Sequence, residues 1–253
     1  METISVEHHG NVAVVKLSRG VTNAINLQLI GELADSLQAV KRDPAVRGLV
    51  LCSANDKFFS IGLDIPTLFD LTRQDFTAFC HAYSRVCLDV YTLPKPTVAA
   101  LAGHATAGGC IVALCCDYRF MAQGRKLMGL NEIKLGVPVP YLADCILRQL
   151  VGVRNARDIM DTGEFYLPEQ LLALGMVDQV LPLDQLLPRS IEKAATLGAL
   201  PQEAFAVIKQ NRIEAVEREL LAHEEEQVRS FVECWYLDQT RERLREAIKK
   251  FQA

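Results

Sequence analysis

The stretch HATAGGCIVALCCDYRF, residues 104–120, contains the feature on which the predicted architecture depends. A run of small residues ends in Gly108 and Gly109 and passes directly into an apolar segment. Glycines at such a junction let the backbone come close to another group. If a helix begins at Gly108, its first N–H groups are free and lie at the positive end of the helix, where they suit an anionic oxygen. A pair of tight turns is the other interpretation, and spacing alone leaves both open.

Outward from this stretch, short apolar segments alternate with helical patterns. Strands are expected at residues 4–9 and 12–18 around a turn at Gly10–Asn11, and again at 47–53, 97–103 and 117–122. Between them, one helix follows a cap at Asn26 and another spans about 74–91. Strand and helix alternating in this way predict an α/β fold with a mostly parallel sheet and helices packed outside it.

The chain changes character after Gly136, and from Gln202 to Phe251 it is nearly all helical and heavily charged. We therefore predict an α/β catalytic core over residues 1–195 and a helical extension over 196–253. Apolar residues recur at helical spacing in the extension and end in Phe231, Trp235 and Tyr236. Such a stripe needs cover. A homotrimer or a pair of trimers, built mainly from about Leu183 onward, would provide it; a lid folded back over the chain's own active site is the alternative.

Composition sets the broad class of the protein. Half of the 253 residues are apolar, so a large core can form, and the net charge of −4 gives no basic field for nucleic acid. The eight cysteines contain no Cys-x-x-Cys pair, which predicts buried thiols rather than disulfides, with Cys110, Cys115 and Cys116 as helix core. No membrane span or targeting signal is recognisable, so a cytoplasmic protein is expected.

A candidate general base lies in LMGLNEIKLGVPVP, residues 127–140. Glu132 stands there among apolar residues, and desolvation would raise its pKa toward the range of a general base. An exposed glutamate at the start of a helix is the alternative. His104 lies in the glycine-containing loop, where satisfaction by backbone groups is favoured over a catalytic role.

Four segments together carry a resemblance to a known family. FFSIGLDI (58–65), AGHATAGGCIVALCCDYRF (102–120), GLNEIKLG (129–136) and ALGMVDQVLP (173–182), in this order and spacing, resemble the enoyl-CoA hydratase/isomerase (crotonase) superfamily. Within it, the second and third segments are most similar to Δ3,Δ2-enoyl-CoA isomerases of fatty-acid β-oxidation. The resemblance implies a spiral ββα core, a helical trimerisation region and an acyl-CoA substrate. It implies no metal and no separate cofactor, because coenzyme A is part of the substrate.

The resemblance also assigns roles to residues. The backbone N–H groups of Leu63 and Gly108 would form an oxyanion hole for the thioester oxygen. CoA would lie along the segment from Ser60 to Asp64, which includes Ile61, with its adenine held partly by backbone groups of this segment. Lys249, with Arg245 and Lys250, would reach a CoA phosphate, although a solvated helix face also explains these residues.

The reaction is predicted from one missing carboxylate. Hydratases of the superfamily carry two glutamates; here Ile111 occupies the first position and Glu132 the second. A single carboxylate can remove a proton from C2 of a 3-enoyl-CoA and return it at C4, and Ile111, Leu135 and Val137 would exclude water around C4. Isomerisation is therefore expected.

Three departures from the family's pattern and several alternative functions remain. Ile61 and Ala107 stand where a smaller residue or a third glycine is frequent, and Asn131 stands where hydratases have proline. The alternatives are a hydratase, a thioesterase, and a non-catalytic or RNA-binding protein on the same scaffold.

Overall fold

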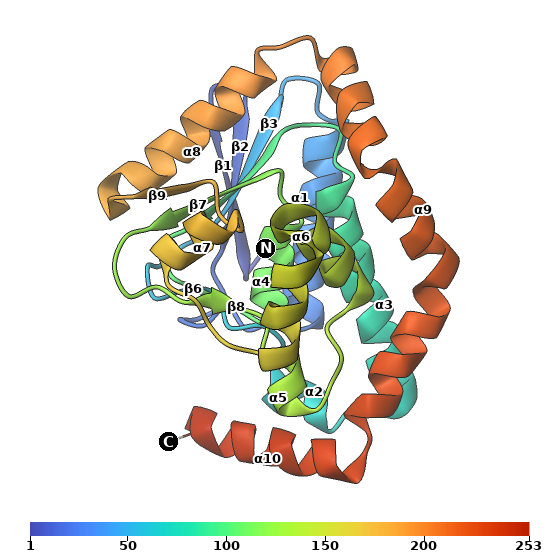
Figure 1. Cartoon of the computed structure of the whole chain (residues 1–253). Helices are drawn as coiled ribbons and strands as arrows, with labels where there is room; N and C mark the ends of the chain where they lie inside the picture. The colour runs from blue at the N-terminus through green and yellow to red at the C-terminus, as the bar shows by residue number, and fades with distance from the viewer. Residues whose placement is uncertain (253) are drawn as a thin grey trace.

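The computed structural model describes residues 1–252, with side chains to Lys249, and contains two β-sheets. Among these residues, six strands form the larger sheet in the order β1-β2-β3-β5-β7-β9 (Figure 1). Its strands are β1 (Ile4–His9), β2 (Val12–Leu17), β3 (Gly48–Ser53), β5 (Thr97–Leu101), β7 (Tyr118–Ala122) and β9 (Gln179–Leu181). Only the β1–β2 pair is antiparallel. The mostly parallel sheet expected from the sequence is confirmed.

Both faces of the central strands are buried because helices cover each side. Alternate residues, such as Val50 in β3 and Val98 in β5, pack against helix α8 (Leu183–Gly198). The residues between them, such as Leu51 and Ala99, belong to the main core. That core includes helices α1 (Leu27–Arg42) and α3 (Arg73–Tyr91). Burial on both faces explains why these strands read as continuous apolar runs.

Three very short parallel strands form a second sheet in the order β4-β6-β8. They are β4 (Phe58–Ser60), β6 (His104–Thr106) and β8 (Met128–Gly129). None of these three strands is among those expected from the sequence, and His104, expected in a loop, begins β6. Strands of two or three residues have no measurable alternation and form only when their partners are already in place.

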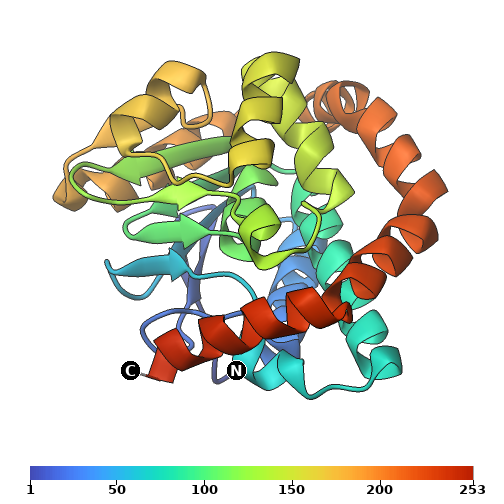
Figure 2. The same ribbon diagram turned by 60° about the horizontal axis from the view of Figure 1, so that its bottom comes forward.

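The two sheets together show the repeating ββα unit that the resemblance implied. β3 leads into β4 and α2 (Ile65–Phe69); β5 leads into β6 and α4 (Gly108–Leu114); β7 leads into β8 and α5 (Glu132–Leu135). Each unit therefore crosses from the large sheet to the small one before its helix. As a result the helices α2, α4 and α5 begin close to one another, at the end of the small sheet (Figures 1 and 2).

The remaining helices wrap around this core. α6 (Tyr141–Thr162) and α7 (Pro168–Leu174) precede β9, and α9 (Gln202–Trp235) packs along α3 and α6. α10 (Asp238–Gln252) crosses below α2 and α5 in the view of Figure 1 and comes to the front in that of Figure 2. None of the helices within residues 1–252 is long and apolar enough to cross a membrane.

The aromatic end of α9 is covered by the chain itself. Trp235 is 1% exposed and stacks on Phe76 of α3, with ring centroids 4.4 Å apart. Tyr236 donates a hydrogen bond to the carbonyl of Leu71. These aromatic residues therefore need no partner subunit to cover them, and the fold-back alternative describes this part of α9. The division at residue 195 stays a prediction; it falls inside α8, which packs on the large sheet.

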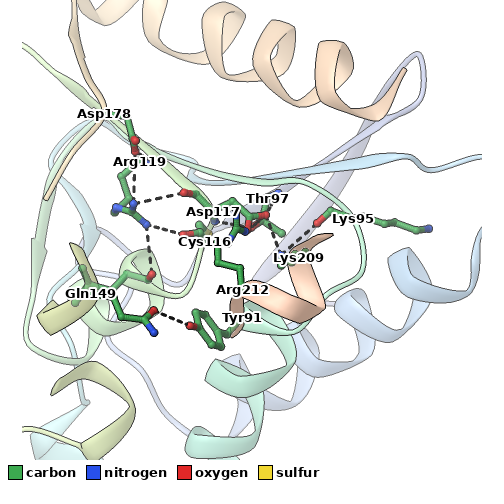
Figure 3. A network of polar contacts seen from close by, with 11 residues as sticks. Tyr91, Lys95, Thr97, Cys116, Asp117, Arg119, Gln149, Asp178, Lys209 and Arg212 are labelled. Atoms are coloured by element: carbon green, nitrogen blue, oxygen red, sulfur yellow. Dashed lines mark hydrogen bonds and ion pairs between the residues drawn. The ribbon is translucent and has the colours of Figure 1, made fainter. Parts of the chain in front are cut away.

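A buried polar network joins the start of α9 to the core (Figure 3). Lys209 is 2% exposed, and its Nζ lies 2.8 Å from the carboxylate of Asp117. The same carboxylate accepts from Thr97 and pairs with Arg212. Asp117 immediately precedes β7 and Thr97 begins β5, so the network fixes α9 against the N-terminal ends of these two strands.

Candidate functional site

A cavity of about 500 Å³ brings together residues from distant parts of the chain. It is lined by Leu63, by Gly108 at the start of α4, and by Glu132 at the start of α5. Ile61 lines it as well. Its walls are mainly apolar and include Cys80, Leu88, Ile111, Val137, Phe231 and Trp235. The structure thus places the three predicted catalytic residues around one space.

Leu63 differs from its neighbours in having a free N–H. The N–H groups of Ile61, Gly62, Asp64 and Ile65 all donate hydrogen bonds to oxygens of the chain at 2.8–3.1 Å. The N–H of Leu63 donates to no described acceptor. A buried N–H without a partner is costly in a folded protein, so one that lines a cavity is suited to a ligand oxygen.

Gly108 provides a second free N–H because it is the first residue of α4. The N–H groups of the first helical turn have no partner within the helix. A Cβ added at Gly62 would lie only 3.0 Å from the nitrogen of Gly108, so the two segments pack directly against each other. The two donors therefore come from neighbouring backbone segments and can converge on one oxygen atom.

The residue before Gly108 is strained. Ala107 has φ 48° and ψ −126°, a combination that glycine adopts easily and alanine does not. Backbone strain of this kind costs about 1–3 kcal/mol and occurs often at functional sites. The departure noted at Ala107 thus has a structural consequence, which is strain in the backbone beside the free N–H.

Close packing of α4 against β4 explains why residue 109 is glycine. A Cβ at this position would lie 2.4 Å from the carbonyl oxygen of Ser60, so α4 can pack against β4 only if residue 109 is glycine. Neither Gly108 nor Gly109 has a positive φ. The pair therefore marks a helix start with a close backbone approach, and the interpretation as tight turns is wrong.

Glu132 is 5% exposed, which excludes the alternative of an exposed glutamate. Its Oε2 has no hydrogen-bond partner among the described residues. Burial raises the pKa of this carboxyl from 4.5 to about 7. A carboxyl group with that pKa can both take and return a proton at neutral pH.

The surroundings of Glu132 are largely apolar, but a second carboxylate also lines the cavity. Ile111, Leu135 and Val137 are among the lining residues, as expected. Glu224 of α9 lines it too, and its carboxylate lies 3.6 Å from Nδ1 of His81. Glu224 was not among the residues predicted from the sequence, although its helical spacing to Val228 and Phe231, which also line the cavity, was a usable signal.

His104 is satisfied by the backbone, which confirms the favoured interpretation. Its Nδ1 accepts a hydrogen bond from the N–H of Leu127 at 2.9 Å, and burial lowers its pKa. The eight cysteines are free thiols, as predicted, and all but the half-buried Cys234 are buried. Burial raises the pKa of Cys116 to about 12 and that of Cys110 in the same direction, so neither is a thiolate.

The other residues assigned to CoA do not line the cavity. The hydroxyl of Ser60 donates to the carbonyl of Asn23 at 2.8 Å, and Asp64 pairs with Arg19 at 2.7 Å. Both side chains therefore serve the local fold. Lys249 is exposed on α10, and the side chain of Lys250 lies outside the described residues. Among the described residues, no three His, Cys, Asp or Glu side chains gather as metal ligands.

Comparisons with known proteins agree with this arrangement. A family model described as enoyl-CoA hydratase/isomerase matches residues 7–252. The chain is 32% identical over 222 residues to human mitochondrial enoyl-CoA delta isomerase 1, covering 87% of the chain and 74% of that protein. It is 30% identical over 209 residues to crotonyl-CoA hydratase of Syntrophomonas wolfei, covering 82% and 80%. Among solved structures, that of human mitochondrial delta3-delta2-enoyl-CoA isomerase is similar, with a TM-score of 0.95 at 29% identity over 99% of this chain and 98% of that one.

Proposed function

Because the chain belongs to the enoyl-CoA hydratase/isomerase family, we propose that it converts 3-enoyl-CoA to 2-trans-enoyl-CoA with Glu132 as the proton carrier. The main observation in support is that Glu132 is buried, with its Oε2 unpaired, in the same cavity as Leu63 and Gly108, whose backbone N–H groups are free. Similarity to the human isomerase in sequence and in structure supports the choice of reaction.

The proposed chemistry moves one proton along the acyl chain. Glu132 removes a proton from C2, and the negative charge spreads onto the thioester oxygen as a dienolate. The N–H groups of Leu63 and Gly108 hold that oxygen, and each donor contributes about 3–4 kcal/mol to transition-state stabilisation. Glu132 then returns the proton at C4. A pKa of about 7 is matched to both halves of this transfer.

Hydration is the second candidate, and two observations favour it. One is the similarity to crotonyl-CoA hydratase; the other is Glu224, a second carboxylate at the cavity. Against it stands Ile111, which lines the cavity where hydratases carry the first of their two glutamates and which cannot activate water. A thioesterase and a non-catalytic scaffold remain as further alternatives without a specific supporting contact.

Parallel assays with 3-hexenoyl-CoA and crotonyl-CoA separate the two reactions. We expect isomerisation to be much faster than hydration, abolished in Glu132→Gln, and retained in the matched variant Glu224→Gln. Hydration that equals or exceeds isomerisation, or loss of isomerisation in Glu224→Gln, would reject the single-carboxylate mechanism.

CoA binding along residues 60–64 and at Lys249 is part of the same proposal. Ile61 and Leu63 line the cavity, whereas Lys249 is an exposed cation at the end of α10. A phosphate contact by Lys249 predicts that Lys249→Ala raises KM and leaves kcat unchanged. The reaction would need no separate cofactor, because CoA is part of the substrate.

We also propose a homotrimer or a dimer of trimers. Leu183, Val207 and Ile208 are between 47% and 65% exposed on α8 and α9, and burial of such residues would favour association. Light scattering tests this, since a mass near one chain at micromolar concentration would exclude it.

A cytoplasmic location is retained as a proposal, although the name of the human isomerase states that it is mitochondrial.

A further inference from the structure

Tyr83 of α3 is a buried polar residue that the proposed mechanism does not use. Its side chain lines the cavity beside Gly108 and Glu132 and is 7% exposed. Its hydroxyl donates a hydrogen bond of 2.7 Å to the carbonyl of Gly108. Tyr83 therefore contacts the backbone of a proposed oxyanion donor from a helix that is far from it in sequence.

The peptide between Ala107 and Gly108 has a competing orientation. Rotating ψ of Ala107 by 180° from −126° gives 54°, which together with φ 48° is the left-handed helical region. Alanine adopts that region more readily than its present conformation. The rotation would also turn the N–H of Gly108 away from the cavity. The orientation that serves catalysis is thus the more strained of the two and depends on contacts that hold it.

Three hydrogen bonds hold this turn in place. The N–H of Ala107 donates to the carbonyl of Gly129 at 2.9 Å, and the N–H of Ile111 donates to the carbonyl of Ala107 at 3.0 Å. The third is the bond from Tyr83, which fixes the peptide after Gly108. Gly108 has no side chain to restrict its backbone, so this third bond adds a restraint to the one that its place in α4 provides.

We propose that Tyr83 is a positioning residue for the oxyanion hole: its hydroxyl holds Gly108 so that the Gly108 N–H points at the thioester oxygen. The inference rests on the proposed function, since it requires an acyl-CoA in the cavity. The ring is held in turn by stacking on Phe79, with centroids 6.4 Å apart and an interplanar angle of 7°. Burial raises the pKa of the phenol well above its usual value, so Tyr83 stays a hydrogen-bond donor throughout the physiological range.

Tyr83→Phe removes the hydroxyl and keeps the ring. Misdirecting one oxyanion donor lowers kcat by about tenfold or more, while substrate binding depends on the rest of the cavity. We therefore expect kcat to fall by about tenfold and KM to stay within about threefold. Tyr91→Phe is the matched control, because Tyr91 lies in the same helix and bonds Gln149 away from the cavity.

A spectroscopic measurement separates positioning from a general structural role. A saturated acyl-CoA, isotopically labelled at the thioester carbonyl, is bound to each protein, and the infrared carbonyl stretch is compared with that in water. Hydrogen bonds from an oxyanion hole lower this frequency. We expect the lowering in the wild type and in Tyr91→Phe, and less than half of it in Tyr83→Phe.

The outcomes distinguish this inference from the proposed function. If the wild type shows no lowering with bound acyl-CoA, the oxyanion hole fails, and the inference fails with it. If the wild type shows it and Tyr83→Phe retains it in full with normal kcat, only the role of Tyr83 is overturned. A Tyr83→Phe protein that does not fold also overturns the inference, because the hydroxyl would then hold the fold rather than the N–H of Gly108.

Discussion

Removing the charge of Glu132 should stabilise the protein at alkaline pH while abolishing its activity. The pKa of this carboxyl is about 7 in the folded protein, against 4.5 for an ordinary glutamate, because the side chain is buried. Each pKa unit corresponds to about 1.4 kcal/mol, so ionising Glu132 in the folded state costs roughly 3 kcal/mol. Glu132→Gln keeps nearly the same shape and cannot ionise.

The sign of the effect follows from proton binding. Below pH 4.5 the carboxyl is protonated in both states, so wild type and variant should have similar free energies of unfolding. Between pH 4.5 and about 7 only the unfolded wild type is ionised, so its stability falls as the pH rises. Above about pH 7 the loss is complete, and Glu132→Gln should be more stable by roughly 3 kcal/mol.

Urea unfolding of both proteins from pH 4 to 9 measures this difference. All other titrating groups are shared, so the difference between the two free energies isolates Glu132. We expect it to grow by about 1.4 kcal/mol per pH unit and to level off near neutrality. The kcat/KM of the wild type should rise over the same range, since the base must be ionised. A difference that does not vary with pH would refute the reasoning, because Glu132 would then titrate normally.

Four further substitutions, one of them a control, test the backbone and the buried ion pair. Ala107→Gly relieves a strained φ/ψ pair and should raise the free energy of unfolding by up to about 1 kcal/mol with activity retained; a loss of stability would contradict the strain. Gly109→Ala places a Cβ 2.4 Å from the backbone of β4 and should cost several kcal/mol, whereas Gly31→Ala, in open space within α1, should stabilise by about 0.5–1 kcal/mol; equal effects on thermal unfolding would disprove the close approach. Lys209→Met leaves Asp117 buried without its closest buried partner and should cost about 3 kcal/mol in urea unfolding; a neutral result would show that Arg212 compensates.

The residues alone determined the parts of this protein that depend on local preference. Asn26 caps α1 by accepting from the N–H of Leu29 at 3.0 Å, as its position predicted, and the turn at Gly10 joins β1 to β2. The buried strands were recognisable because both of their faces are covered, which leaves an uninterrupted apolar run. The burial of Glu132 was one of two interpretations that its apolar neighbours allowed. Local patterns suffice where a residue's environment comes from its own segment.

The site itself needed more than local pattern. The type of a residue does not show whether its backbone N–H is free. The assignment of Leu63 and Gly108 to an oxyanion hole therefore came from the resemblance to the family. In the structure, the N–H of Leu63 is free although its neighbours are bonded, and the N–H of Gly108 is free because α4 begins there. Nothing in the sequence indicates the role proposed for Tyr83, because an aromatic residue on the buried face of a helix is usually a core residue. Only the structure shows that its hydroxyl bonds the carbonyl of Gly108.

Tertiary structure decided which segments meet, and it placed the aromatic end of α9 on the chain itself. The strands β4, β6 and β8 are only two or three residues long and exist because they pair with one another. More than forty residues of chain separate β4 from β6. The spacing of the apolar residues on α9 predicts that they are buried. It does not predict whether the same chain or a partner subunit buries them. Phe76 of the same chain does so at Trp235, where α9 runs along α3. Helical periodicity specifies a buried face, and only the packing of distant segments specifies its partner.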